Sequence, residues 1–282
     1  MSESSLYRPL ARTVEGDRLI ETFAATEHVG SPWGPMQHGG PVAALLARAM
    51  DRHDPRPGCR TSRVTIDLLG PVPVGEVRVS ARTERPGRRI ALIQAILEAR
   101  DRDGTWRPYA HGSAWRLATQ RTHDVIHRGD SSQRPPDPSA GTVHDHRIPD
   151  AWRLGGFVGA VEWRVAQLGT RAGVPTVAWV NLTRALIEGE QTSDLERLIA
   201  LADTANGVGA RLDPARFTFL NTEMTVHLHH PPSGQWYGLE AETSIGPDGI
   251  GTSSGVLHAE AGPIGRVTQN LLVERLPEHD RR

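Results

Sequence analysis

Residues 37–49 read Gln-His-Gly-Gly-Pro-Val-Ala-Ala-Leu-Leu-Ala-Arg-Ala, and residues 194–205 read Asp-Leu-Glu-Arg-Leu-Ile-Ala-Leu-Ala-Asp-Thr-Ala. Aligned without gaps, His38 corresponds to Asp194, and Ala47 corresponds to Asp203. The first stretch opens an apolar helix with a glycine pair but has no acid inside it. The second carries an acid in an apolar helix but has no glycine pair at its start. We interpret the two stretches as copies of one duplicated unit that build a single site from both halves.

The duplication continues further along the chain. Residues 64–71 align with residues 224–231, and both segments alternate as β-strands do and end at a proline. Second strands are predicted at 77–83 and 237–243. The offset between copies is 156 residues at the helices and 160 at the strands, so only loop lengths differ. With two copies, the expected product is a pseudo-dimer within one chain.

Each copy is predicted to contain one buried helix and an antiparallel meander. In the first copy we expect a helix that Gly39 or Gly40 caps, with Pro41 in its first turn. In the second copy, Ser193 and Glu196 form a capping box for a helix that runs to about Gly207 or Gly209. The predicted strands are 19–28, 62–69, 75–84, 89–101 and 107–117 in the first copy, and 158–168, 176–183, 216–229, 235–244, 250–260 and 264–275 in the second. The predicted units are residues 1–120, a Pro- and Ser-rich linker at 121–154, residues 155–276 and a charged tail at 277–282.

Composition narrows the class of protein. The chain has 282 residues, of which 38% are hydrophobic, and this suits two cores of ordinary size. A formal net charge of -1 gives no electrostatic reason to expect nucleic acid or an anionic membrane as partner. Cys59 is the single cysteine, so no intrachain disulfide can form. No apolar leader or membrane-length apolar run is present, and we expect a cytoplasmic protein without membrane insertion.

Four motifs stand out: Gln37-His38-Gly39-Gly40, Leu201 to Gly207 with Asp203, Asn221 to Pro232 followed by Gly234-Gln235-Trp236, and Gly265 to Gln269. Together they resemble the acyl-CoA thioesterase II (TesB-like) group, whose members have a double hotdog fold. The resemblance implies an α+β chain of two tandem hotdog repeats, each an antiparallel sheet wrapped around a central apolar helix. It also implies hydrolysis of an acyl-CoA thioester to a carboxylic acid and CoA, in a homodimer.

In that group an Asp, a Thr or Ser, and a Gln from the second hotdog hold the attacking water. Asp203 and Gln269 match the first and last of these. At the hydroxyl position a gapless alignment places Asn221, with Thr222 beside it, and only one of these neighbours can face the site because a strand alternates its faces. We expect Asp203 to act as base or nucleophile and Gln269 to orient the water.

The helix start supplies the second part of the expected site. The first N–H groups of a helix lack intrahelical partners, so those after His38, Gly39 and Gly40 can polarise a thioester carbonyl. We interpret His38 as a structural loop histidine in preference to a catalytic base. Nothing in this chemistry requires a metal or an organic cofactor.

Two other functions stay open. One is a non-catalytic acyl-CoA-binding protein, which Asn221 in place of a hydroxyl favours. The other is an enoyl-CoA hydratase or dehydratase, which places Asp and His in one short motif. The sequence argues against the latter, because His38 and Asp203 are far apart along the chain. The sequence does not decide the length of the acyl chain. It also does not decide whether the acyl group is carried by CoA or by acyl carrier protein.

Overall fold

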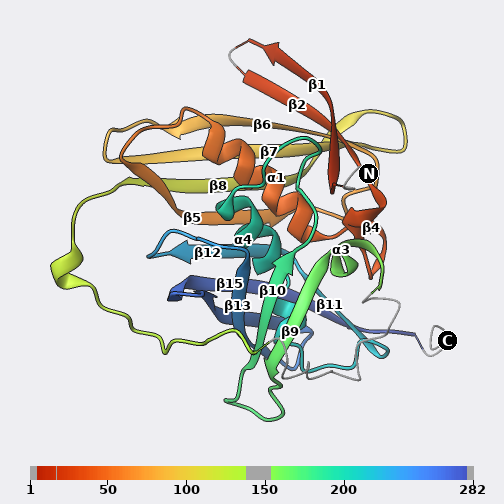
Figure 1. Cartoon of the computed structure of the whole chain (residues 1–282). Helices are drawn as coiled ribbons and strands as arrows, with labels where there is room; N and C mark the ends of the chain where they lie inside the picture. The colour runs from red at the N-terminus through yellow and green to blue at the C-terminus, as the bar shows by residue number, and fades with distance from the viewer. Residues whose placement is uncertain (1–4, 17, 138–153, 278–282) are drawn as a thin grey trace.

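The computed structural model describes residues 5–16, 18–137 and 154–277 (Figure 1). The N-terminal half contains one long helix and a meander of long strands. Its elements are β1 (Tyr7–Glu15), β2 (Arg18–Ala25), the 3-10 helix η1 (Glu27–Val29), β3 (Gly30–Ser31), β4 (Gly34–Gln37), α1 (Gly39–Arg52), β5 (Cys59–Leu68), β6 (Glu76–Arg85), β7 (Ile90–Arg100) and β8 (Trp106–Ala118).

The C-terminal half repeats this order with a shorter helix that is broken near its end. After a 3-10 turn, η2 (His123–Val125), its elements are α3 (Gly156–Gly159), β9 (Val161–Gln167), β10 (Thr176–Leu182), α4 (Asp194–Ala202), α5 (Ala205–Val208), β11 (Phe217–Asn221), β12 (Glu223–Leu228), β13 (Trp236–Ile245), β14 (Ile250–Ala259) and β15 (Gly262–Arg275). The capping box of Ser193 and Glu196 at the start of α4 is confirmed.

One continuous antiparallel sheet joins the two halves. Its order is β1-β2-β6-β7-β8-β5-β12-β15-β14-β13-β10-β9, with β11 also paired to β15. The halves meet where β5 pairs with β12, and there Thr65 lies opposite Thr225. These two residues are equivalent by the 160-residue offset. Equivalent residues can face each other in this way only on a two-fold axis, so the sheet supports the duplication read from the sequence.

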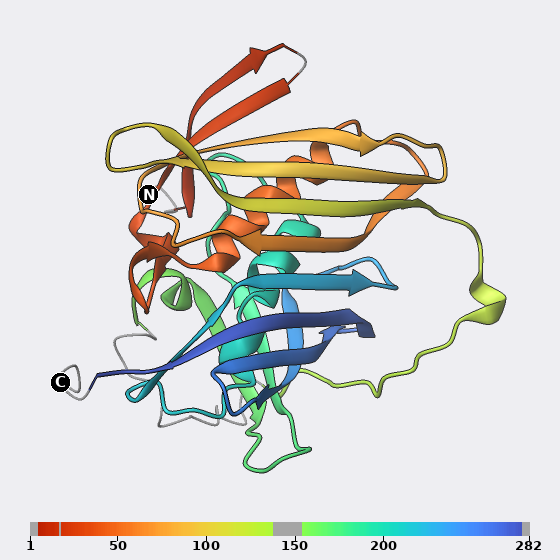
Figure 2. The same ribbon diagram turned by 180° about the vertical axis from the view of Figure 1, so that it is seen from behind.

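Each half-sheet wraps around a central helix. Figures 1 and 2 show α1 and α4 lying side by side against one face of the sheet, with α1 over the upper strands β5 to β8. Val42, Leu46, Leu198 and Ile199 in these helices are at most 1% exposed. Burial of apolar area on this scale is the main force that holds such a fold together. This arrangement is the predicted double hotdog.

Buried ion pairs link α1 to the second half of the chain. Arg48 in α1 is 3% exposed and contacts Glu21 at 2.7 Å and Glu190 at 2.9 Å. Arg52, one turn later, also contacts Glu190, at 2.7 Å. Since Glu190 belongs to the second half, these ion pairs tie both halves together beside the helix pair.

The structure differs from the predicted elements at several points, among them the start of the predicted strand 158–168, where helix α3 ends at Gly159. β1 was not predicted, because its residues are exposed and lack apolar alternation. The predicted long helix of the second half is broken after Ala202 and continues as α5 from Ala205. At the break the Thr204 hydroxyl donates a hydrogen bond to the Leu201 carbonyl at 2.7 Å and interrupts the helical hydrogen bonds. The predicted strand 216–229 is split in two at Thr222.

The segment after β8 crosses to the C-terminal half. Its described part, residues 119–137, has η2 as its regular structure, and it is held by Arg128 on the Ala261 carbonyl and by Gln133 on Glu240, at 3.0 and 3.1 Å. The rest of the predicted linker and residues 278–282 of the predicted tail lie outside the described residues, and the predicted unit boundaries stay predictions.

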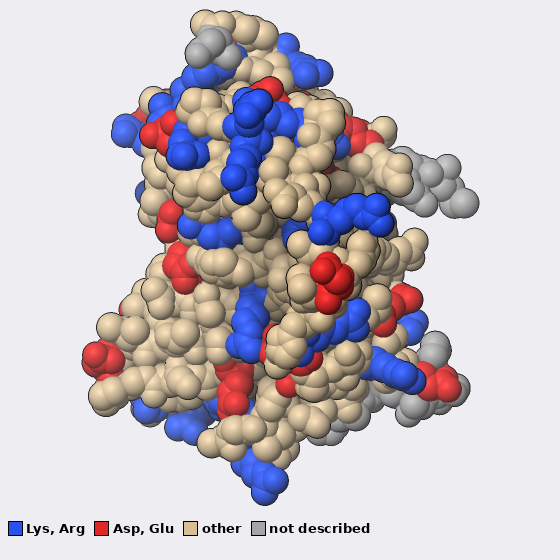
Figure 3. Space-filling view, turned by 90° about the vertical axis from the view of Figure 1, so that its left-hand side faces the viewer, with Lys and Arg blue, Asp and Glu red and all other residues tan. Residues whose placement is uncertain are grey.

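Two surface properties bear on partners. On the face shown in Figure 3, Arg side chains stand in separate groups with Asp and Glu between them. Among the described helices, none is both long and apolar enough to cross a membrane.

Candidate active site

A cavity of about 680 Å³ opens between the two halves, beside the start of α1 and the end of α4. Its size is ordinary for a site that takes a small organic ligand. The wall is mainly apolar, with contributions from both halves of the chain. Among the lining residues are Trp33, Val42, Leu68, Trp163, Val165 and Phe219. Trp33 and Phe219 meet edge to face with ring centroids 5.0 Å apart, so that one residue from each half contributes to this aromatic part of the wall.

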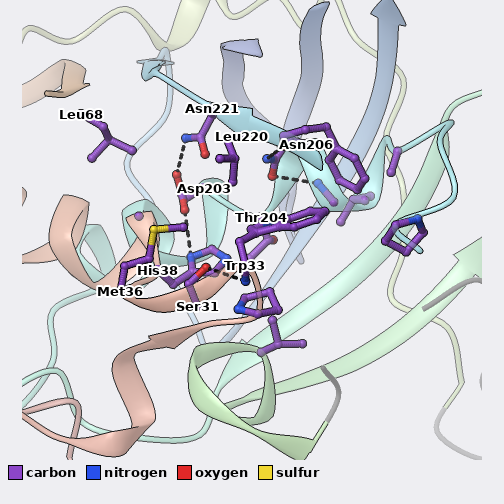
Figure 4. A pocket seen from close by; sticks show the side chains of 18 of the residues that line it. Ser31, Trp33, Met36, His38, Leu68, Asp203, Thr204, Asn206, Leu220 and Asn221 are labelled. Atoms are coloured by element: carbon purple, nitrogen blue, oxygen red, sulfur yellow. Dashed lines mark hydrogen bonds and ion pairs between the residues drawn. The ribbon is translucent and has the colours of Figure 1, made fainter. Parts of the chain in front are cut away.

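Asp203 is the buried carboxylate of this cavity. It caps the C-terminus of α4 and is only 2% exposed. Asn221 donates a hydrogen bond from Nδ2 to Asp203 Oδ1 at 2.8 Å, and His38 Nδ1 lies 3.0 Å from Oδ2. Figure 4 shows Asp203 between the other two side chains. The two halves therefore meet in a His38–Asp203–Asn221 cluster.

His38 has two possible partners for the same ring nitrogen. Nδ1 is 3.0 Å from Asp203 Oδ2 and 3.1 Å from the backbone N of Gly40. With a proton on Nδ1, His38 donates to the carboxylate; without it, Nδ1 accepts from Gly40 and caps α1. His38, not a glycine, is thus the N-cap residue. The presence of a proton on Nδ1 therefore decides whether His38 binds the Asp203 carboxylate or the first turn of α1.

The close packing of the start of α1 against the end of α4 explains why residues 39 and 40 are glycines. A Cβ on Gly39 would stand 2.7 Å from Asp203 Oδ2, and a Cβ on Gly40 would stand 2.5 Å from the Ala200 carbonyl oxygen. Both glycines therefore let the first turn of α1 approach the end of α4. The N–H of Gly39 belongs to the open first turn of α1, and Gly39 lines the cavity.

A β-bulge decides which of the two neighbours reaches Asp203. Asn221 lies opposite Leu271, whereas Thr225 lies opposite Thr268, so one extra residue is accommodated between β11 and β12. Such a bulge re-aims side chains. The result is that the Asn221 amide faces Asp203, while Thr222 is exposed at the rim of the cavity.

Gln269 supports Asp203 from behind. It is fully buried on β15, and its Nε2 donates to the main-chain carbonyl of Asp203 at 3.0 Å. Gln269 does not belong to the residues that line the cavity. The structure thus brings Asp203, Asn221, His38 and Gly39 to the cavity and holds Gln269 one layer away from it.

Other polar groups of the wall are occupied by protein partners. Gln37 accepts from the Tyr7 hydroxyl at 2.6 Å and donates to the Pro73 carbonyl at 2.8 Å. Burial raises the pKa of Tyr7 well above its usual value, so this hydroxyl remains a donor. Asn206 donates to the Phe219 carbonyl at 3.2 Å. Gln37 and Asn206 are therefore engaged with the protein, whereas Asp203 presents the buried carboxylate of the wall.

Phe157 is a site residue that the sequence did not reveal. It belongs to the four-residue helix α3, is fully buried, and packs on His38 with ring centroids 4.8 Å apart. Its position depends on Gly156, which has φ +55° and where a Cβ would collide with the Gly30 carbonyl oxygen. An isolated aromatic after a glycine pair has no periodicity to identify it.

His229, one of the histidines near residue 230, contacts the protein main chain. His229 Nε2 lies 3.1 Å from the Pro263 carbonyl oxygen. Across the described parts of the chain, no three His, Cys, Asp or Glu side chains gather as metal ligands would.

Sequence-family comparison identifies both halves. Residues 29–117 match the acyl-CoA thioesterase N-terminal domain, and residues 132–273 match the acyl-CoA thioesterase C-terminal domain. No curated protein sequence matched the chain.

Solved structures share the fold along nearly the whole chain. A hotdog-fold protein of unknown function from Alicyclobacillus acidocaldarius is 16% identical with a TM-score of 0.70, covering 95% of this chain and 96% of its own. The tesB protein of Mycobacterium avium subs paratuberculosis is 14% identical with a TM-score of 0.65, covering 92% and 93%. The acyl-CoA thioesterase II TesB2 of Mycobacterium marinum is 11% identical with a TM-score of 0.64, covering 95% and 96%. With a double hotdog fold and both domains matched in order, the chain belongs to the TesB-like acyl-CoA thioesterase family.

Proposed function

We propose that the protein hydrolyses an acyl-CoA thioester to a carboxylic acid and CoA. One observation carries the proposal: a buried carboxylate, Asp203, stands at the wall of an apolar cavity and faces the open first turn of α1. An apolar cavity suits an acyl chain, and the helix start suits the carbonyl oxygen of a thioester. Membership of the thioesterase family supports the same reaction.

The proposed reaction assigns a role to each group. The acyl chain occupies the cavity, and the thioester carbonyl oxygen accepts from the Gly39 N–H. Asp203 takes a proton from water as the water oxygen attacks the carbonyl carbon. The C–S bond then breaks, the thiolate of CoA takes the proton, and the acid leaves. A preorganised oxyanion donor of this kind is worth about 10²–10³ in rate.

Asn221 and Gln269 position the base in this scheme. The Asn221 amide donates a hydrogen bond to Asp203 Oδ1 and thereby positions the carboxylate. The Thr or Ser of the family's motif instead holds the attacking water. Gln269 holds the Asp203 main chain and, through its carbonyl, is suited to orient water on the protein side of the carboxylate. Thr222, at the rim, is left without a part in the chemistry.

A second candidate is supported by the contact of His38 with Asp203. The sequence argues against a hydratase or dehydratase because neither residue has the other near it in one short motif, but in the folded chain His38 Nδ1 lies 3.0 Å from Asp203 Oδ2. A His–Asp pair can move the protons needed to add water across an enoyl-CoA double bond. We place this reaction second because the family match favours hydrolysis.

One assay separates these reactions. The protein is incubated with saturated and α,β-unsaturated acyl-CoAs of several lengths, and free thiol and enoyl absorbance are followed together. Hydrolysis releases thiol from both kinds of substrate; hydration consumes the enoyl absorbance without releasing thiol.

The Asp203→Asn variant tests the assigned base and is matched by Asp194→Asn, which changes an exposed carboxylate at the opposite end of α4. We expect Asp203→Asn to lower kcat by about 10² or more, as is typical for loss of a general base, while acyl-CoA still binds. Full thiol release by Asp203→Asn would refute the assignment, and acyl-CoA binding by a parent that shows no turnover would favour the non-catalytic protein.

A further inference from the structure

Three buried polar side chains form a row across the C-terminal sheet behind Asp203. Thr243 on β13 lies opposite Ser253 on β14, and Ser253 lies opposite Gln269 on β15. Residues directly opposite each other in such a sheet have Cβ atoms about 4.5–5.5 Å apart. Ser253 and Gln269 are 0% exposed, and Thr243 is 8% exposed. The row therefore runs from the Asp203 main chain toward the surface at Thr243.

Each member of the row has a buried oxygen with unmet hydrogen-bonding capacity. Gln269 Oε1, Ser253 Oγ and Thr243 Oγ1 have no hydrogen-bond partner among the described residues. Buried polar atoms in folded proteins are nearly always hydrogen-bonded to protein or to ordered water, and leaving one unpaired is costly. Three such atoms on adjacent strands supply the two to four partners that an internal water needs.

The duplicated half of the chain provides an internal comparison. Stepping outward from the central β5–β12 pair by strand register, the equivalents of Thr243, Ser253 and Gln269 are Thr83, Ile93 and Ala114. Ile93 and Ala114 are apolar and buried. In that half the helix also carries Ala47 where the second copy has Asp203. The complete polar row thus accompanies the carboxylate and is lost in the copy that lacks it.

We propose that the Thr243–Ser253–Gln269 row binds internal water and delivers it to Asp203 from the sheet side for hydrolysis. This inference rests on the proposed thioesterase function. An acyl chain that fills the apolar cavity displaces water from that side, whereas the row approaches Asp203 through Gln269, which the cavity does not contain. The hydrolytic water therefore has its own path, and Ser253 and Thr243 are positioning residues for it.

Stability measurements test water binding without reference to activity. Ser253→Ala and Thr243→Val each delete one hydroxyl of the row with little change of shape, and Ser254→Ala deletes an exposed hydroxyl next to it. If the row binds water, the first two variants lose a satisfied hydrogen bond and their urea midpoints fall, while Ser254→Ala is unchanged. If the row is dry, both changes remove an unpaired buried hydroxyl and the midpoints rise, which overturns the proposal.

Kinetics test delivery. We expect Ser253→Ala to lower kcat for thiol release about tenfold, the effect of losing one water-mediated hydrogen bond, with KM unchanged because the acyl cavity is untouched. Parental kcat in both Ser253→Ala and Thr243→Val overturns delivery. A crystal structure that shows ordered water within hydrogen-bonding distance of Ser253 Oγ and Gln269 Oε1 supports the row directly.

The two proposals fail in different ways. A parent protein that releases no thiol from any acyl-CoA overturns the thioesterase function and the delivery of water with it. Water binding by the row is then still decided by the urea midpoints alone.

Discussion

Replacing Gly39 by alanine tests the contact between the two halves at the site. The new Cβ would lie 2.7 Å from Asp203 Oδ2 and 2.9 Å from Oδ1. Real Cβ contacts essentially never fall below 3.0 Å, so the carboxylate has to move by at least about 0.3 Å, and by roughly 0.8 Å for the separation of about 3.5 Å at which neighbouring atoms pack well. Asp203 cannot retreat freely, because Asn221 holds Oδ1 at 2.8 Å and Gln269 holds its main chain.

The expected loss is large for activity and small for stability. A misplacement of this size at a reacting group costs about 10² in rate, so kcat/KM for thiol release should fall about 100-fold. Overpacking costs about 1–3 kcal/mol, and alanine in place of a helical glycine returns up to about 1 kcal/mol. The free energy of unfolding should therefore fall by about 0–3 kcal/mol, less than the total stability of a typical domain.

The matched control is Gly207→Ala. Gly207 is also helical and also lines the cavity, but a Cβ there meets nothing within 4 Å. Thiol release is measured for both variants at the same acyl-CoA concentrations, and urea unfolding confirms that both are folded. Parental activity in Gly39→Ala, or an equal loss in Gly207→Ala, would refute the reasoning that Asp203 must stay where the glycine lets it lie.

Two further predictions concern stability. Arg48→Met should lower the free energy of unfolding by about 3 kcal/mol in urea titrations, because it leaves the carboxylates of Glu21 and Glu190 without their buried partner; a change near zero would show that the bridge is dispensable. Burial lowers the pKa of His258, against the opposing effect of Glu240. As the pH falls below about 6.5, the unfolded chain takes up a proton that the folded chain resists, so stability should drop between about pH 7 and 5. His258→Gln should flatten that part of the stability curve, and an unchanged slope would contradict this assignment.

Much of the fold could be predicted from the sequence because its signals are local. The apolar helix of residues 39–52, the capping box at Ser193 and the strand alternation around Thr65 and Thr225 each depend on neighbouring residues. The equivalence of the last two, read from the duplication, reappears as their pairing across the halves. β1 gave no such signal, because an exposed edge strand needs no apolar face.

The candidate site was less accessible to sequence reasoning because its geometry is not local. Asp203 stood out as an acid in an apolar stretch, but its place at a helix end depends on the Thr204 hydroxyl. The choice between Asn221 and Thr222 depends on a bulge whose register is set by β15. His38 reaches Asp203 only through the packing of α1 against α4, which spacing along the chain does not report.

Joining two hotdogs in one chain has released them from symmetry. In a dimer of identical subunits every substitution appears at both related positions, so a residue that improves one centre is also imposed on the other. Here Thr65 and Thr225 still mark the old axis, yet His38 and Asp194, or Asp203 and Ala47, can change independently. One copy can thus hold the carboxylate while the other presents the helix start, and Arg48, next to Ala47, is free to pair with Glu190 of the other half.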